Sequence, residues 1–312
     1  MESNRSKNIS IRYLLIFLAC FLSLSLRAAK ILIDGIYYSY EEGNSEASVC
    51  GVGYIQPYSS VKILPYLNIG NGKNYKVTSI GQEAFKSCSL ASIEIPNSVT
   101  SIGNGAFQKC SYLTSIEIPN SLTSIGNDAF RDCIWLTSIM IPNSVTSIGS
   151  SAFYGCSGLT SITIPDSVTT IENETFYCCS GLTSIKIPNS VTTIGSLAFR
   201  DCSGLTSIKI PNSVTTIGDA AFILCSGLTS IEIPNSVTTI GNNAFGGCSG
   251  LTSIEIPNSV TSIAYSTFAG CSGLTSIKIP NSVTTIGRNA FCLCIYNHRT
   301  TKTNQKYPSV NL

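Results

Sequence analysis

Residues 202–224 read CSGLTSIKIPNSVTTIGDAAFIL, and Cys225 begins the same wording again. A phenylalanine recurs in each such unit every 22 or 23 residues, and a cysteine follows it by three residues. The phenylalanines are Phe85, Phe107, Phe130, Phe153, Phe176, Phe199, Phe222, Phe245, Phe268 and Phe291. A fixed period of this length is typical of stacked units that share one continuous core, so the sequence predicts a repeat solenoid of about ten repeats.

Each unit contains the pattern of a short strand. Leu159-x-x-Ile162-x-Ile164 matches the L-x-x-L-x-L core of a leucine-rich repeat, with isoleucine for the later leucines. Alternation places Ile162 and Ile164 inward and Thr163 outward. Pro165 ends the strand because it has no N–H to donate to a ladder. The predicted fold is a leucine-rich-repeat solenoid with parallel β-strands on one side.

A short helical turn is predicted on the other side of each unit. Polar residues suited to a helix N-cap precede it, and glycines suited to a left-handed C′ position follow the core phenylalanine. The N-cap candidates are Asn104, Asn127, Ser150, Asn173, Ser196, Asp219 and Asn242. The C′ candidates are Gly158, Gly181, Gly204, Gly227, Gly250 and Gly273.

The wording I-P-N-S-V-T-x-I-G-x-x-A-F-x-x-C, repeated from about residue 84 to Cys294, resembles the BspA-like leucine-rich repeats of bacterial surface proteins. The resemblance assigns residues 81–294 to the solenoid, and residues 30–80 look like the N-terminal β-rich cap that such proteins often carry. It implies a secreted or surface-displayed binding protein. Because family members are associated with adhesion, the implied partner is a protein on host matrix or neighbouring cells.

Residues 1–29 have the pattern of a signal peptide. Arg5, Lys7 and Arg12 precede the apolar run 13–26, and small residues follow at Ala28 and Ala29. That run is shorter than the ~20 residues of a membrane span, so we expect cleavage near residue 29 and no transmembrane segment in the mature chain. Lipidation of Cys20 is the alternative, although the apolar residues directly after it argue against it. The predicted location is secreted or on the bacterial cell surface.

Charge and histidine content argue against several functions. Removing residues 1–29 takes away four basic residues and one acidic residue, so the formal charge falls from +2 to −1. A near-neutral chain without a basic run is not expected to bind nucleic acid. The single histidine, His298, lies in the polar tail 295–312, so a catalytic triad or a histidine zinc site is improbable. We expect a protein that is not an enzyme and that holds no cofactor or metal.

The fourteen cysteines allow two interpretations. An exported chain favours disulfides, and stacking would bring the repeated cysteines within bridging distance. However, side chains at one repeated core position point in parallel rather than toward each other. The preferred interpretation is therefore a row of small, buried, unreactive thiols.

Variable positions are where a solenoid can encode recognition. The predicted outward residues of the strands are Glu94, Glu117, Met140, Thr163, Lys186, Lys209, Glu232, Glu255 and Lys278. Like charges adjoin in this series, which is mildly destabilising on a sheet. The charges are either selected for binding or tolerated because salt screens them.

Two groups of residues are candidates for protein binding. The first is Tyr112 and Trp135, which replace the repeated glycine, with Met140 nearby on the strand. The second consists of residues that directly follow the core phenylalanine in successive repeats: Arg131, Tyr154, Tyr177 and Arg200. Aromatic and arginine side chains are frequent binding hot spots. Alternatively, these long side chains only cover the outer edge of the stack.

The polar tail 295–312 carries no recognisable closing repeat. Three interpretations remain open. The tail folds over the last repeat as a cap, the last repeat is left uncovered, or the chain is a shortened gene product. Near-identical repeats also favour a rival to the binding function, an inert structural array or truncated repeat product with no dedicated ligand.

Overall fold

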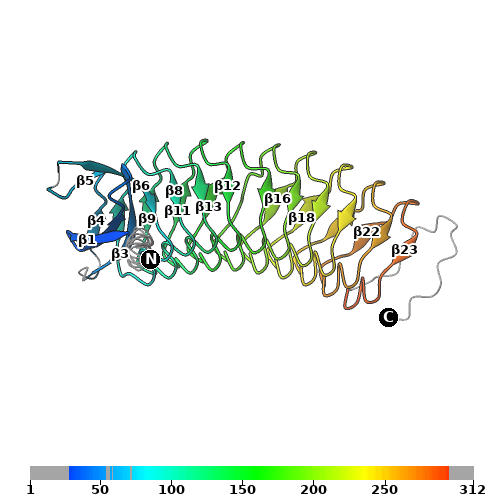
Figure 1. Cartoon of the computed structure of the whole chain (residues 1–312). Coiled ribbons are helices and arrows are strands. Elements are labelled where there is room, and N and C mark those ends of the chain that lie inside the picture. The colour runs from blue at the N-terminus through cyan, green and yellow to red at the C-terminus, as the bar shows by residue number, and fades with distance from the viewer. Residues whose placement is uncertain (1–27, 54–56, 58, 71, 295–312) are drawn as a thin grey trace, which may run out of the picture.

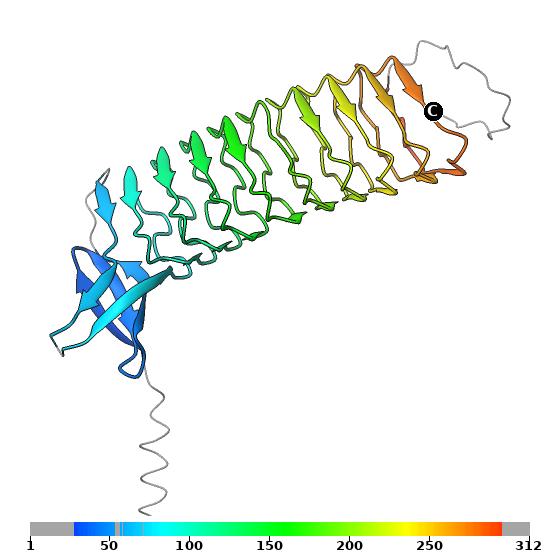
Figure 2. The ribbon, with the colours of Figure 1, turned by 90° about the horizontal axis from the view of Figure 1, so that it is seen from above.

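A computed structural model describes residues 28–53, 57, 59–70 and 72–294. These residues form an elongated solenoid with a small β structure at its N-terminal end (Figures 1 and 2). Successive coils are joined by parallel strand pairs in register, such as Ile139 with Ile162. The predicted leucine-rich-repeat solenoid is therefore confirmed. The proposed signal peptide, apart from its last two residues, and the polar tail lie outside the described residues.

Except for β4, which pairs with the first strand of the repeats, the N-terminal strands form one sheet that runs directly into the solenoid. Its order is β1–β2–β3–β6–β8, with β5 paired to the side of β6. The strands of this region are β1 (Ala29–Ile33), β2 (Ile36–Tyr40), β3 (Glu46–Val52), β4 (Ser60–Lys62), β5 (Tyr66–Asn68) and β6 (Asn74–Ile80). The buried Tyr38 hydroxyl accepts a hydrogen bond from the Leu64 N–H at 3.1 Å. Because β3 and β6 are parallel, the cap continues the stacking direction of the repeats.

The first ladder of the solenoid consists of three-residue strands with the sequence Ser-Ile-x. They are β7 (Ser92–Glu94), β9 (Ser115–Glu117), β11 (Ser138–Met140), β13 (Ser161–Thr163), β16 (Ser207–Lys209), β18 (Ser230–Glu232), β20 (Ser253–Glu255) and β22 (Ser276–Lys278). The coil between β13 and β16 joins the ladder through single bridges at Lys186. Apart from the half-buried Ile277 of β22, the central isoleucines are buried, and the third residues are exposed, as the alternation predicts.

A second ladder of two-residue strands forms the next side of each coil. They are β8 (Ser101–Ile102), β10 (Ser124–Ile125), β12 (Ser147–Ile148), β14 (Thr170–Ile171), β15 (Thr193–Ile194), β17 (Thr216–Ile217), β19 (Thr239–Ile240), β21 (Ser262–Ile263) and β23 (Thr285–Ile286). Sequence analysis predicted no strand at these positions. The strands are too short for periodicity to reveal them, since two residues hold a single alternation.

The third side is built from turns, and the predicted short helical turns are wrong. Two residues of each coil have left-handed backbones, as at Asp128 (φ 54°) and Asp132 (φ 59°), which a right-handed helix excludes. Alternate N–H groups then bond to the next coil, for example Phe130 N–H to the Ala152 carbonyl at 2.8 Å. The described residues contain no helix because these groups find partners between coils rather than within one.

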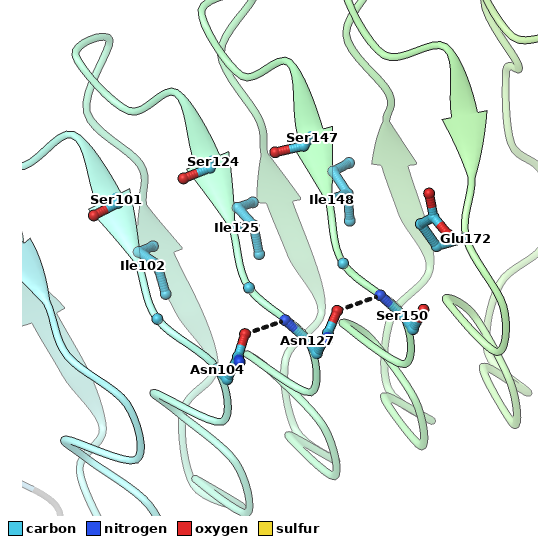
Figure 3. A pocket seen from close by; sticks show the side chains of 13 residues that line it. Ser101, Ile102, Asn104, Ser124, Ile125, Asn127, Ser147, Ile148, Ser150 and Glu172 are labelled. Carbon is cyan, nitrogen blue, oxygen red and sulfur yellow. Dashed lines mark hydrogen bonds between the residues drawn. The ribbon is translucent and has the colours of Figure 1, made fainter.

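The supposed helix caps have other roles. The Asn104 Oδ1 accepts the Asn127 N–H at 2.9 Å, and the Asn127 Oδ1 accepts the Ser150 N–H at 2.9 Å (Figure 3). Gly158 is absent from the left-handed region; a Cβ there would lie 2.6 Å from the Ile134 carbonyl oxygen of the preceding coil. This glycine is therefore needed for close packing of coils and not for a left-handed turn.

The core is a continuous stack of phenylalanine rings. Neighbouring rings are nearly parallel, with centroids 5.2 to 5.7 Å apart, and all but the last, Phe291, are fully buried. Beside them, the buried cysteine thiols donate to the phenylalanine carbonyl of the preceding coil, as from Cys156 to Phe130 at 3.1 Å. The described cysteines are free thiols, since each buried sulfur is directed at a carbonyl oxygen.

Candidate protein-binding surfaces

One continuous row of side chains on the turn side consists of Arg131, Tyr154, Tyr177 and Arg200. We call it the aromatic row. Each follows a buried phenylalanine in successive coils, so stacking of the core places these side chains next to one another. The Tyr154 and Tyr177 rings stack with centroids 4.4 Å apart and an angle of 11° between them. The Arg131 guanidinium lies 4.0 Å from the Tyr154 centroid, and that of Arg200 lies 5.0 Å from the Tyr177 centroid.

Carboxylates hold the two arginines in place. Arg131 contacts Asp128 at 3.1 Å and Asp132 at 3.8 Å, and Arg200 contacts Asp201 at 3.1 Å. The hydrogen bond that Arg200 donates to the Asp201 carboxylate raises the pKa of Arg200, and partial burial raises the pKa of Tyr177. The row therefore presents two stacked tyrosine rings between two fixed cations.

The other predicted group does not form one patch. Trp135 is 58% exposed and precedes β11, whereas Met140 is 80% exposed and ends that strand. The two side chains thus start from opposite ends of β11. Tyr112 is 43% exposed at the position equivalent to Trp135 in the preceding coil. Tyr112 and Trp135 share one edge of the first ladder, and Met140 belongs to its exposed face.

The exposed third residues of the first ladder form a row across the solenoid. Sequence analysis missed its first member, Lys62, because residues 30–80 lack the repeat wording; β4 places it beside Glu94 with a 2.6 Å ion pair. We call the complete series the outward row: Lys62, Glu94, Glu117, Met140, Thr163, Lys186, Lys209, Glu232, Glu255 and Lys278. At its far end Lys278 pairs with Glu255 at 2.5 Å.

A groove of about 470 Å³ crosses the second ladder between the first coils (Figure 3). Its walls are the repeated serines, glycines and asparagines, with Glu172 at one end. The asparagine oxygens are already used in hydrogen bonds between coils, as described above for Asn104 and Asn127. In the described part of the chain, no group of three or more His, Cys, Asp or Glu side chains is placed to hold a metal ion.

Comparison with known families identifies the repeat. The model of the BspA type leucine rich repeat region matches residues 78–206 and 196–307. The chain belongs to the BspA-type leucine-rich repeat proteins. No curated protein is similar enough to count as a match. Within the described ranges, no helix is long and apolar enough to cross a membrane.

Several solved structures of bacterial proteins are similar to this one. A leucine rich cell surface protein from Faecalibacterium prausnitzii A2-165 is 28% identical, with a TM-score of 0.53 over 86% of this chain and 87% of that chain. The T. pallidum leucine rich repeat protein is 28% identical, with a TM-score of 0.50 over 72% of this chain and 91% of that one. The pneumococcal vaccine antigen PcpA, 22% identical, shares the fold, with a TM-score of 0.59 over 86% of this chain and 80% of that one.

Proposed function

We propose that this chain is an exported, non-catalytic surface protein that binds a protein ligand on host matrix or neighbouring cells through the aromatic row. Its membership of the BspA-type repeat proteins and its similarity to a bacterial cell surface protein support the location. The stacked Tyr154–Tyr177 pair between two guanidinium groups carries the choice of site.

The row suits protein recognition for an energetic reason. Tyrosine and arginine supply large contact areas together with hydrogen-bond donors, and they are enriched among binding hot spots. Stacking and the flanking carboxylates have already restricted their rotamers, so binding loses less side-chain entropy than it would on a mobile surface. The tyrosine hydroxyls and guanidinium groups can donate hydrogen bonds, so they favour a ligand segment with carbonyl or carboxylate acceptors.

The test compares matched variants on one biosensor surface. Residues 30–312 are immobilised and exposed to purified extracellular matrix proteins and to intact bacterial cells. We expect Tyr154→Ala with Tyr177→Ala to weaken any binding by about 30-fold or more, as removal of a hot spot does. Trp135→Gly is the control, because it installs the glycine found at this position in most repeats.

The outcomes separate the candidate surfaces. Loss of binding only in Trp135→Gly would move the site to the edge shared with Tyr112. A further variant, Lys278→Ala, probes the strand face, and loss of binding only in that variant would move the site to the outward row. Absence of any ligand across the panel would favour the inert array over the proposed function.

A further inference from the structure

The outward row contains one side chain from each coil, and all of them except Met140 and Thr163 are charged. Neighbouring members are paired across the ladder, as Lys209 is with Glu232 and Glu255 with Lys278. Coils in a parallel ladder repeat every ~4.8 Å, so the row has a fixed spacing. Figure 2 shows the strands that carry it lying side by side along the solenoid.

The charges of this row are antisymmetric about the point between Met140 and Thr163. One step outward in each direction, Glu117 corresponds to Lys186. The next steps match Glu94 with Lys209, and then Lys62 with Glu232. Every charge on the N-terminal side of this point thus has the opposite charge at the same distance on the C-terminal side.

A two-fold axis turns this antisymmetry into complementarity. If the axis lies parallel to the strands between Met140 and Thr163, a second copy presents its row in reversed order. Glu117 then faces Lys186 of the second copy, Glu94 faces Lys209, and Lys62 faces Glu232. Each of these pairs occurs twice because of the symmetry. We propose that the strand face binds a second copy of this chain in this antiparallel, two-fold symmetric arrangement.

Other positions of the two-fold axis bring fewer opposite charges together. Centring the axis between Lys209 and Glu232 also pairs Lys186 with Glu255, but it then places Lys278 opposite the uncharged Thr163. Centring it between Thr163 and Lys186 places Glu117 opposite Glu232, which is repulsive. Like charges facing each other across an interface suppress a wrong register, so the row specifies one alignment.

The proposed dimer also accounts for features that are unfavourable in one chain. Lys186 adjoins Lys209, and Glu94, which also pairs with Lys62 of its own chain, adjoins Glu117, although like neighbours on a sheet repel. Met140, 80% exposed, lies beside the axis and becomes covered. Glu255 and Lys278 fall beyond the paired part of the row and neutralise each other within the chain.

The contact is narrow, so we expect a weak and salt-dependent dimer. Sedimentation velocity of residues 30–312 should show a concentration-dependent dimer at low ionic strength that dissociates at about 0.5 M salt. Lys186→Glu with Lys209→Glu, and separately Glu94→Lys with Glu117→Lys, should each weaken self-association by about a hundredfold or more.

Mixing those two variants is the decisive experiment. Each variant repels itself, but together every reversed charge meets an opposite one, so the mixture should form heterodimers. The control Glu255→Lys with Lys278→Glu changes as many charges outside the paired region and should dimerise like the parent chain. Melting curves of all variants should agree, since the substituted side chains are exposed.

The proposal would be overturned by a parent chain that remains a monomer at low salt. Undiminished dimers of the Lys186→Glu, Lys209→Glu variant, or a mixture that stays monomeric, would overturn it as well. The proposed dimer surface does not include the aromatic row. The double variant Tyr154→Ala with Tyr177→Ala should therefore leave the dimer intact, whatever its effect on ligand binding.

Discussion

At the scale of single residues, the stacked rings dominate stability. The Phe199 ring lies 5.4 Å from that of Phe176 and 5.2 Å from that of Phe222, and it is fully buried. Phe199→Ala removes both contacts and leaves a cavity between coils, so we expect a loss of about 3–5 kcal/mol in the free energy of unfolding. Lys186→Ala, on the exposed face, should change it by less than about 0.5 kcal/mol. Urea denaturation measures both, and equal shifts would contradict the assignment of inside and outside.

Glycine positions differ in what they tolerate. Gly158→Ala places a methyl group 2.6 Å from the Ile134 carbonyl oxygen, a backbone atom that cannot move aside alone. We expect overpacking to cost about 1–3 kcal/mol. The control is Gly246→Ala, whose nearest neighbours, the Asn243 carbonyl oxygen and Ile223 Cγ1, would lie at 3.4 Å, so its unfolding midpoint should stay close to that of the parent chain. A harmless Gly158→Ala would disprove the close approach of coils as the reason for this glycine.

At the scale of elements, the repeated cysteines from Cys110 to Cys271, here called the cysteine row, are buried side by side in the core. Burial raises the pKa of Cys110, Cys156 and Cys248 to about 12, so these thiols stay protonated and unreactive in the folded chain. Iodoacetamide should label them slowly in native protein and completely after denaturation without reductant. Finding half or more of the row joined by disulfides would contradict this reading of the core.

The same thiols make the free energy of unfolding depend on pH in the alkaline range. Their contribution is fully present below a pH of about 9, where thiols of the unfolded chain are protonated too. Between pH 9 and the folded pKa of about 12, only the unfolded chain ionises, so stability falls by up to about 1.4 kcal/mol per pH unit for each thiol. Urea midpoints at about pH 8 and pH 10.5 test this. Cys156→Ala should reduce the difference between them.

At the scale of the whole molecule, export is the first prediction to check. A basic segment, an apolar run and small residues follow one another in residues 1–29, in the order that a signal peptide requires. Mass spectrometry of protein from its native cell should find an N-terminus between Ala28 and Lys30. An intact Met1 would contradict export by this route, and a lipid on Cys20 would replace it with anchoring.

The two proposed interaction surfaces occupy different sides of each coil. The aromatic row lies on the turn side, and the outward row lies on the first strand ladder. Pairing of two chains through their strand faces therefore leaves both aromatic rows free. A dimer would present two ligand sites, which increases avidity without any new contact to the ligand.

The repeat period by itself determined the solenoid, the buried isoleucines and phenylalanines, and the exposure of the outward positions. These follow from sequence because one unit cannot bury its apolar groups alone, so identical units must stack. The period also placed Arg131, Tyr154, Tyr177 and Arg200 in consecutive coils. Only the structure showed that they stack, because ring orientation and the Asp128 and Asp201 contacts are not encoded in spacing.

Tertiary structure decided what the backbone does between the strands. A short helical turn and the observed left-handed turns fit the same local residues, since Asn104 suits a helix cap as well as its observed hydrogen bond to the next coil. The choice is made by the next coil, whose carbonyls accept the N–H groups that a helix would keep. The place of Lys62 in the outward row was likewise decided by strand pairing across the stack, because hydrogen bonds between coils join residues that the repeat pattern alone does not relate.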